Sequence, residues 1–372
     1  MKKITFIILC LEGALLSFNV AAAAALIPSV AKEFALSQFC VGTIVWVYMI
    51  TYGIAALIYG PSVRRFDART VELCCIFLFS LANLMVGLAK GFGVLLTGRF
   101  LMGFFGASVI PLGLILIARH KEKAERGKYI GIFFGCTFIA SLLGLFLSGI
   151  IYWRAIFLIP GILGFLLWLA MYFYLPRFKD DAGHLEFNYV RVLRNRAVFG
   201  ILLYIFLISL IYHAVQQWLG VYFSTRIGLR QFNISMLITV TALSGILGEV
   251  WGGVLADSLG RKKIVNWGIL LMALSVFSLL LRLPLFALAI IMALWGLGWT
   301  FNHVGLATIL TDLPRESLNE AASLNSSIRF ISGGIGMGIG GLIMSKSFGL
   351  GFIVFGIGIL FLLFLGILPE NK

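Results

Sequence analysis

Residues 253–263 decide how this chain folds, and they read Gly253-Val-Leu-Ala-Asp257-Ser-Leu-Gly260-Arg261-Lys262-Lys263. The segment lies between two long apolar runs and combines glycines, one acid and three consecutive basic residues. Glycine lets two helix ends approach closely, and the acid places a charge at a helix terminus. Basic residues hold the end of an apolar helix at the cytoplasmic surface of a membrane. The segment therefore predicts a short cytoplasmic connection between two membrane-spanning helices.

Apolar runs of membrane-spanning length recur along the whole chain. Of its 372 residues, 61% are hydrophobic and 12% are charged, which is outside the range of soluble domains. A bilayer core of about 30 Å is crossed by a helix of about 20 residues. The connections leave no room for a catalytic or nucleic-acid-binding domain, so we expect an all-α membrane protein that is not an enzyme. Twelve transmembrane helices are predicted, over residues 4–31, 41–60, 71–89, 93–118, 128–151, 155–175, 198–224, 232–256, 264–281, 284–310, 318–344 and 348–368.

The placement of basic residues explains the formal net charge of +14. Of the 29 lysines and arginines, 20 lie at helix ends and loops that a cytoplasmic N-terminus places inside, and seven lie at those outside. This bias follows the positive-inside rule, so the charge indicates topology and not affinity for nucleic acid. We expect an integral protein of a cytoplasmic (inner) membrane, surrounded by lipid, with both termini cytoplasmic.

The first 25 residues have some features of a cleavable signal peptide, with two lysines, an apolar stretch and a run of alanines. Glu12 interrupts the apolar stretch, and cleavage would leave eleven helices and reverse the charge bias. The segment is therefore expected to remain as the first helix. The five cysteines have no metal-ligand spacing, so we expect small packing residues and neither a metal nor another cofactor. They are Cys10, Cys40, Cys74, Cys75 and Cys136.

The longest polar segment divides the chain into two halves of six helices. We predict an N-terminal six-helix bundle over 1–175, a cytoplasmic linker over 176–197 and a C-terminal six-helix bundle over 198–372. The loop after the second helix occupies the same position in the N-terminal half as residues 253–263 do in the C-terminal half. It reads Gly60-Pro-Ser-Val-Arg64-Arg65-Phe-Asp67-Ala-Arg69. In this first copy Arg64 stands at the position of Asp257, and Asp67 at that of Gly260. Only the second copy keeps the full set.

These segments resemble the major facilitator superfamily of secondary transporters. Residues 253–262 match its loop signature G-x-L-a-D-r-x-G-r-k at every strong position. Three other segments resemble the twelve-span drug/proton antiporters of that superfamily. Residues 28–52 resemble their first hairpin, residues 98–103 the arginine motif of their fourth span, and residues 153–157 the start of their sixth span. Their fifth-span motif is only partial, since Ser141 stands where its proline would align. The resemblance implies two six-helix bundles of the major facilitator fold, alternating access and a central substrate cavity.

Polar side chains within the predicted helices concentrate on every third helix, beginning with the first. In the superfamily these helices line the central cavity, and the third, sixth, ninth and twelfth helices pack around them. In this sequence we interpret the third, sixth, ninth and twelfth predicted helices as lacking charged residues. For Asn19, Gln216 and Asn302, bonding between helices is an equal alternative. For the Trp295 and Trp299 pair, ordinary packing is favoured. The resemblance thus implies a substrate cavity that includes Asn19, Arg99, His213, Gln216, Gln217, Trp299, Asn302 and His303.

Two carboxylates are recognised within apolar runs, Glu12 and Glu249. A carboxyl group in a medium of low dielectric favours its protonated form, so Glu12 is a candidate proton carrier, with a position near the inner surface as the alternative. Arg99 resembles the arginine that relatives use in proton coupling, and Glu12 is its expected partner. Glu249 is expected to pair with Arg329, either permanently or in one state only.

The expected activity is transport of a small organic solute, coupled to protons. Efflux of a small amphipathic compound is favoured by the antiporter resemblance, and uptake of a small organic anion is the alternative, favoured by Arg99 and Arg329. Asp257, Gly260 and Arg261 are expected to fasten the cytoplasmic end of the C-terminal bundle, with Glu249 and Arg329 in gating. Glycine runs in the fifth and eleventh helices are interpreted as internal packing, so a monomer is expected. His213 and His303 have no third ligand at helical spacing, so no metal site is predicted.

Overall fold

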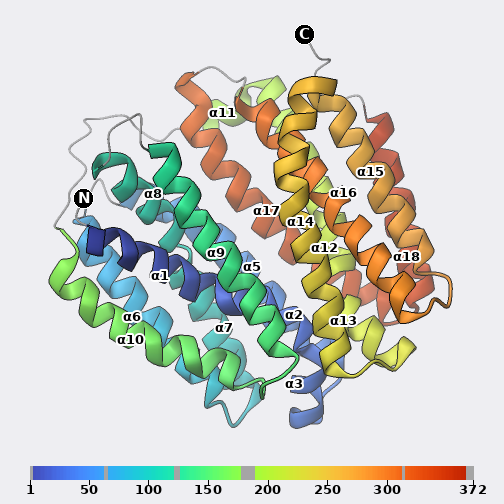
Figure 1. Cartoon of the computed structure of the whole chain (residues 1–372), viewed down its shortest axis with the longest axis horizontal. Coiled ribbons are helices and arrows are strands. Elements are labelled where there is room, and N and C mark those ends of the chain that lie inside the picture. Colours follow the sequence, from blue (N-terminus) through green and yellow to red (C-terminus); the bar gives the residue numbers. More distant parts are fainter. Residues whose placement is uncertain (1–2, 63–65, 121–125, 177–188, 312–314, 366–372) are drawn as a thin grey trace. The chain divides into compact units, whose positions relative to one another are not determined.

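The computed structural model describes residues 3–62, 66–120, 126–176, 189–311 and 315–365. Throughout these ranges the chain is helical, and they contain no strand. The chain forms two compact units, residues 1–187 and 188–372 (Figure 1). Most of the predicted linker falls on 177–188, outside the described residues. The predicted domain bounds at 175 and 198 therefore stay predictions.

The N-terminal unit contains six membrane-length segments, three of which are built from consecutive shorter helices. The first joins α1 to α2 and is followed by the short helix α3, the second joins α4 to α5, and the fourth joins α7 to α8. The bounds are α1 (Lys3–Val20), α2 (Ala22–Ala25), α3 (Ile27–Phe34), α4 (Gln38–Val41), α5 (Thr43–Ser62), α6 (Ala68–Gly87), α7 (Phe92–Gly106), α8 (Val109–His120), α9 (Arg126–Ser148) and α10 (Ala155–Tyr174).

Local sequence sets the helix ends in this unit. Asp67 precedes α6 and accepts a hydrogen bond from the backbone N–H of Thr70 at 3.3 Å, which satisfies a donor of the first turn. Ser37 caps α4 in the same way. Ala35 ends α3 in the left-handed conformation, with φ 53°. Asp67, which departs from the loop signature, thus acts as a helix cap.

The C-terminal unit repeats the arrangement with longer uninterrupted helices. Its seventh span runs from α12 through a short helix into a π-helical turn that ends at Gly228, with φ 77°. The bounds are α11 (Tyr189–Arg194), α12 (Arg196–Gln216), α13 (Leu219–Tyr222), η1 (Phe223–Ile227), α14 (Gln231–Leu259), α15 (Arg261–Ser278), α16 (Leu285–Thr311), α17 (Arg315–Met344), α18 (Phe348–Phe361) and η2 (Leu362–Phe364).

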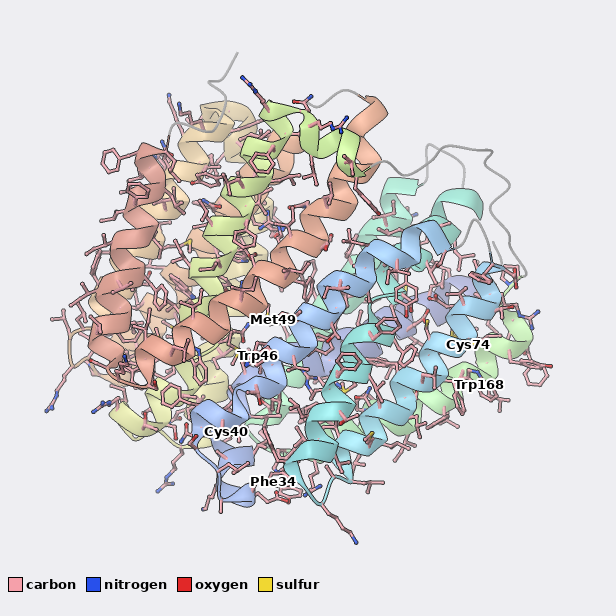
Figure 2. All side chains as sticks on the ribbon, turned by 180° about the vertical axis from the view of Figure 1, so that it is seen from behind. Phe34, Cys40, Trp46, Met49, Cys74 and Trp168 are labelled. Atoms are coloured by element: carbon pink, nitrogen blue, oxygen red, sulfur yellow. The ribbon has the colours of Figure 1, made fainter. Side chains whose placement is uncertain are left out.

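Ten segments of the described chain are long and apolar enough to cross a membrane. The other two predicted spans correspond to α15, which begins with three basic residues, and to the shorter apolar helix 348–364. Large apolar side chains lie exposed on α10 and α14, as contact with lipid requires. Trp168 of α10, which is half-buried, is seen beside α6 in Figure 2, where its ring lies 5.4 Å from that of Phe77. The predicted all-α fold with twelve transmembrane helices is confirmed.

Helices pair in the same order in both units. In the N-terminal unit α1 packs on α9, α5 on α7 and α6 on α10, and in the C-terminal unit α12 packs on α17, α14 on α16 and α15 on α18. Close approach in the α12–α17 pair depends on Gly336 and Gly340, where a Cβ atom would meet the backbone of Leu210 and Ala214. The eleventh-span glycines thus serve packing within the unit.

The cysteines are only partly packing residues. All five are free thiols, and Cys10 and Cys75 are buried as expected. Cys40 and Cys74 are exposed, so the prediction of a packing role is wrong for these two.

Candidate functional site

A stack of three aromatic rings joins α12 to α16. Tyr212 lies against Trp299 with ring centroids 3.9 Å apart and planes 12° apart, and against Trp295 at 5.0 Å and 16°. Trp295 donates its indole N–H to Gln216 Oε1 at 2.6 Å. Because Trp295 and Trp299 are one helical turn apart, they present both rings to the same face of α12. The stack fixes the orientation of Trp299, which is half-buried.

His213 continues this arrangement on α12. Its Nδ1 lies 2.8 Å from the carbonyl oxygen of Ser209, and its ring meets the edge of Trp299 at 5.7 Å and 83°. The hydroxyl of Ser209 donates to the carbonyl oxygen of Arg329 at 2.9 Å. These contacts bring α12, α16 and α17 together around one group of side chains.

Arg329 of α17 is the most unusual member of this group. Its side chain is buried, its Nε donates to Asn325 Oδ1 at 2.9 Å, and its guanidinium carbon lies 5.7 Å from the centroid of the Trp299 ring. Nη1 and Nη2 are buried and have no acceptor among the described residues. Leaving charged donors unsatisfied costs several kcal/mol, so a ligand or water with an acceptor fits here.

Glu249 of α14 pairs with His303 and not with Arg329. Its Oε1 lies 3.0 Å from His303 Nδ1, and the two side chains are 36% and 31% exposed, respectively. The expected direct Glu249–Arg329 pair is therefore wrong in this structure. Arg329 is still close enough to interact electrostatically with both groups. His213, Trp299, His303, Glu249 and Arg329 thus form one cluster, which we call the C-terminal cluster.

Three predicted cavity residues of this unit are not members of the C-terminal cluster. Asn302 is fully buried and faces Tyr204 of α12, so it occupies a helix contact. Gln217 is half-buried and follows the last residue of α12. Gln216 is held by Trp295, as described above, and also serves a contact between helices.

The predicted residues of the N-terminal unit occupy separate helix contacts. Asn19 is fully buried and donates to Asn83 Oδ1 of α6 at 2.5 Å. Arg99 is fully buried, donates from Nε to the carbonyl oxygen of Ile44 at 2.9 Å and lies 4.4 Å from the centroid of the Tyr48 ring. Each side chain thus links its own helix to a neighbour.

Glu12 contacts a second acid, Glu72 of α6, in place of Arg99. Both carboxyl groups are buried and lie within hydrogen-bonding contact of each other. No N–H or O–H donor of the described residues reaches their four oxygens. The expected Glu12–Arg99 pair is wrong. The interpretation that the third span lacks a charged residue is also wrong, because Glu72 lies within it.

Gly260 forms the connection between α14 and α15 that the loop signature predicts. Its φ of 98° lies in the region that favours glycine, and it both ends α14 and precedes Arg261, the first residue of α15. Asp257 lies in the last turn of α14, and its side chain is outside the described residues. The role of these residues in fastening the bundle stays a prediction.

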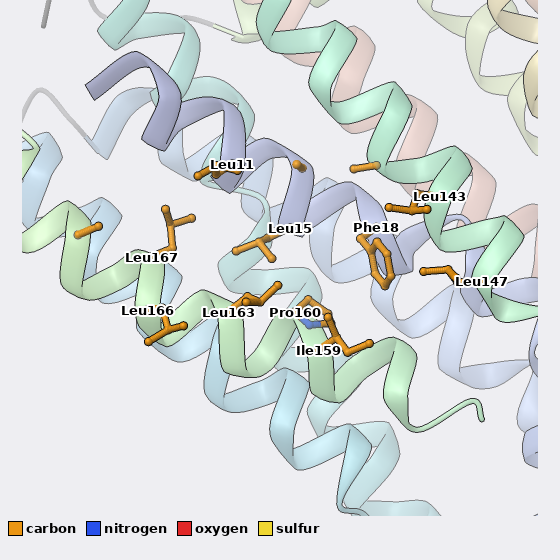
Figure 3. A pocket seen from close by; sticks show the side chains of 13 residues that line it. Leu11, Leu15, Phe18, Leu143, Leu147, Ile159, Pro160, Leu163, Leu166 and Leu167 are labelled. Atoms are coloured by element: carbon orange, nitrogen blue, oxygen red, sulfur yellow. The ribbon is translucent and has the colours of Figure 1, made fainter. Parts of the chain in front are cut away.

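A cavity of about 550 Å³ in the N-terminal unit differs from the predicted polar site. It lies between α1, α9 and α10, and Leu11, Leu15 and Phe18 of α1 face Leu163 and Leu167 of α10 across it (Figure 3). Its lining side chains are apolar throughout. None of the predicted cavity residues lines it.

A polar cluster outside the membrane-spanning segments joins α3 to the start of α10. Glu33 accepts hydrogen bonds from Tyr152 Oη at 2.5 Å, from Arg154 Nε at 3.0 Å and Nη2 at 2.6 Å, and from Trp153 Nε1. Burial by itself raises the pKa of Glu33, but these bonds outweigh it and hold the pKa below its ordinary value. The cluster explains the segment at 153–157 as a structural joint.

Sequence reasoning missed Glu72, Tyr212 and Asn325. Glu72 stands only two residues inside its apolar run, where an acid resembles a helix end. The signal that could have found it is the spacing of Glu72, Cys75 and Asn83, which repeats one helical face. Tyr212 and Asn325 precede His213 and Arg329 by one and four positions, and only the fold shows that they hold the predicted residues.

Two bundles of membrane-crossing helices, with buried charged groups and a signature loop between two of the helices, define a helical membrane transport protein. The sequence model of the Major Facilitator Superfamily matches residues 9–337. The chain therefore belongs to this superfamily, and it is a transporter of small-molecule substrates and not an enzyme.

Similar proteins include efflux pumps. The purine ribonucleoside efflux pump NepI of Salmonella paratyphi B is 25% identical over 334 residues, which are 87% of this chain and 83% of the pump. NepI of Salmonella typhimurium is 25% identical over 337 residues with the same coverage.

Solved structures share the fold. A bacterial homologue of the human lysosomal transporter Spinster, in an inward-facing and unoccupied conformation, has a TM-score of 0.77 at 15% identity, with 93% of this chain and 83% of that chain covered. The nucleoside transporter NupG has a TM-score of 0.72 at 14% identity, with 96% and 98% covered.

Proposed function

We propose that this protein exports a purine ribonucleoside or a similar small heterocycle from the cell in exchange for protons, by alternating access. The proposed location is the cytoplasmic (inner) membrane, with both termini cytoplasmic and the chain a monomer surrounded by lipid. The charge bias along the sequence supports this topology. The similarity to NepI supports both the direction and the solute class.

The observation that carries the proposal is that two donors of Arg329, Nη1 and Nη2, have no acceptor in the part of the chain that the structure describes. A guanidinium with two free N–H groups binds two adjacent acceptors in a plane. The O6 and N7 atoms of a 6-oxopurine are such a pair, and bidentate contact between arginine and these atoms is worth about 1–3 kcal/mol of discrimination. Trp299, held by Tyr212, supplies a fixed aromatic surface beside the guanidinium.

The remaining members of the C-terminal cluster suit the polar part of such a solute. The carboxylate of Glu249 is partly exposed and keeps acceptor capacity beyond its contact with His303. It can accept a hydrogen bond from a ribose hydroxyl. Asn19, Arg99 and Asn302 support helix contacts and are not assigned to the solute, whereas His213, Trp299 and His303 are.

Transport by purified protein in proteoliposomes tests this function. Vesicles with an imposed proton gradient would be supplied with labelled inosine, and accumulation in the direction of proton exchange is expected. Arg329→Gln should weaken inosine binding by roughly 10- to 100-fold, the equivalent of about 1–3 kcal/mol. Arg282→Gln, which changes an exposed arginine of the same unit, is the matched control. Equal transport by wild type and Arg329→Gln would contradict the assignment.

Uptake of a small organic anion is a second candidate, favoured by the same two donors of Arg329, which have no acceptor among the described residues. A carboxylate also binds a guanidinium through two parallel hydrogen bonds. The two candidates separate in the same vesicles, because uptake moves the solute together with the proton and export moves it against the proton. Accumulation of a labelled monocarboxylate with the proton, and none of inosine, would replace the first candidate by the second.

A further inference from the structure

Glu12 of α1 and Glu72 of α6 form a buried pair of acids that has no basic partner among the described residues. Their residues are 1% and 0% exposed, and the two carboxyl groups contact each other. All four oxygens lack a donor among the described residues. The C-terminal cluster does not explain this pair, because it belongs to the other unit.

The pair cannot carry two negative charges. A single unpaired carboxylate already costs several kcal/mol to bury, and a second in contact with it adds repulsion in a medium of low dielectric. Two acids in contact avoid this by sharing a proton, and a hydrogen bond between two carboxyl groups requires that proton. At least one proton is therefore part of the folded structure.

The groups around the pair are weak acids and a hydroxyl. Tyr59 of α5 and Cys75 of α6 bond to each other and interact electrostatically with Glu72, and Ser108, which precedes α8, bonds to Cys75. None of these side chains supplies a positive charge at neutral pH. They stabilise neither ionised acid as a cation would.

The helices packed against α1 and α6 bring no described cation to the pair. On α7, Arg99 is held by Ile44 and Tyr48. On α6 itself, Arg69 is held by the carbonyl oxygen and the ring of Tyr172. On α9, Lys128 is exposed and Cys136 contacts Cys10. The titratable side chains of α10 are Tyr172 and Tyr174 in its last turn, and those of α8 are Arg119 and His120, whose side chains lie outside the described residues.

We propose that Glu12 and Glu72 together bind the proton that drives transport. In the loaded state both carboxyl groups are protonated and the pair is neutral. Release transfers one proton from a carboxyl O–H to water, and the second proton stays between the two acids, so that the pair carries one negative charge. This inference rests on the proposed proton coupling, and it adds Glu72 to the single acid expected from the sequence.

The position of the pair suits exchange with one end of the bundle. Glu72 lies four residues after the start of α6, or about 6 Å along its axis, and Glu12 lies nine residues after the start of α1, or about 14 Å. A proton therefore has only about one helical turn of α6 to pass. Two acids that served only to pack α1 against α6 would not need to lie within reach of a proton from the helix end.

Infrared difference spectra of the purified full-length protein, recorded across a pH titration, test the proposal directly. A protonated carboxyl group has a C=O stretching band that disappears when the proton leaves. We expect wild type to show such a titrating band, and Glu12→Gln and Glu72→Gln each to lose the band at the wild-type titration. An amide cannot release a proton, and the acid that remains no longer shares a proton with a second carboxyl group, so it titrates at a different pH. Glu249→Gln, which changes the partly exposed acid within an apolar run of the other unit, should keep the band. A band that keeps the wild-type titration in Glu72→Gln, or is absent from wild type, overturns the proposal.

Transport measurements separate this inference from the proposed function. Glu72→Gln should still exchange labelled inosine between equal pools on the two sides but should lose accumulation driven by a proton gradient. If Glu72→Gln accumulates inosine as wild type does, the acid pair is not the coupling site and export stands. If neither protein moves inosine while both glutamine variants lose the infrared band, the proton site stands and the solute assignment falls. Should a glutamine variant fail to fold, Glu72→Asp is expected to shift the titration of the band, and an unshifted band counts against the pair.

Discussion

Replacing Glu33 with glutamine measures how strongly the outer polar cluster holds α3 against the start of α10. A hydrogen bond to a charged group contributes about 1.5–3 kcal/mol, whereas an exposed ion pair contributes about 0–1 kcal/mol. The side chains of Arg154 and Glu33 are 19% and 29% exposed, but Trp153, which also bonds Glu33, is only 3% exposed. We therefore expect Glu33→Gln to lower the free energy of unfolding by about 2 kcal/mol, mostly through the Trp153 bond.

A double-mutant cycle isolates the contact with Arg154. Arg154→Ala removes both bonds to Glu33 and the bond from Nη1 to the carbonyl oxygen of Gly87 at 2.9 Å. The double variant should lose about 1 kcal/mol less than the sum of the single variants. Unfolding of the purified protein in detergent measures all four proteins. Lys32→Gln, which changes a neighbouring exposed charge, should stay within about 0.5 kcal/mol of wild type.

The stability difference between wild type and Glu33→Gln should depend on pH in a definite direction. The pKa of Glu33 is held below its ordinary value in the folded protein, and the unfolded chain has a glutamate pKa of about 4.3. The stabilisation is therefore fully present above about pH 4.3 and is lost as pH falls through the lower folded-state pKa. Wild type and Glu33→Gln should differ at neutral pH and converge on acidification. A difference that is the same at every pH, or additive losses in the cycle, would refute the reasoning.

Three further substitutions are checked by thermal unfolding of the purified protein. Gly336→Ala places a methyl group against the backbone of α12 and should cost about 2 kcal/mol, whereas Gly338→Ala on the same helix meets open space and should be neutral or stabilising by up to about 1 kcal/mol. Trp218→Phe removes the indole bond to the carbonyl oxygen of Met337 at 2.9 Å and should cost about 1–2 kcal/mol, and an unchanged melting temperature would contradict it. Gly260→Ala forces a side chain into the left-handed region and should cost about 1–2 kcal/mol, with Gly253→Ala, which meets no atom within 4 Å, as its control.

The fold could be predicted from the sequence because its main signals are local. Each apolar run is long enough to show a membrane span by itself, and the signature at 253–263 fixes the connection at Gly260. The interruption at Ala21 could not be predicted, since no proline or glycine lies in the turn that follows it. Those at Leu26 and Ala107 come shortly before Pro28 and Pro111, whose missing N–H groups break the helical hydrogen bonding.

For the candidate site, the sequence predicts which residues take part but not which of them contact each other. His213, Trp299, His303, Glu249 and Arg329 were all identified, but a sequence does not fix helix rotation, so Glu249 was assigned to Arg329 and Glu12 to Arg99. Charge attraction suggested both pairs. The structure instead satisfies Arg99 with a carbonyl oxygen and an aromatic ring, which leaves Glu12 to meet another acid.

The two proposed sites lie in different units, and this separation limits how they can be coupled. Glu12 and Glu72 belong to residues 1–187, while Arg329 and the rest of the C-terminal cluster belong to 188–372. Because the proton and the solute are assigned to different side chains, we expect coupling to act through a change in conformation and not through competition for one group. Such coupling is reciprocal, so the factor by which a proton on the acid pair changes solute affinity is the factor by which the solute changes proton affinity. Inosine binding to wild type should shift the titration of the carboxyl band, and in Arg329→Gln the same shift should require roughly 10- to 100-fold more inosine.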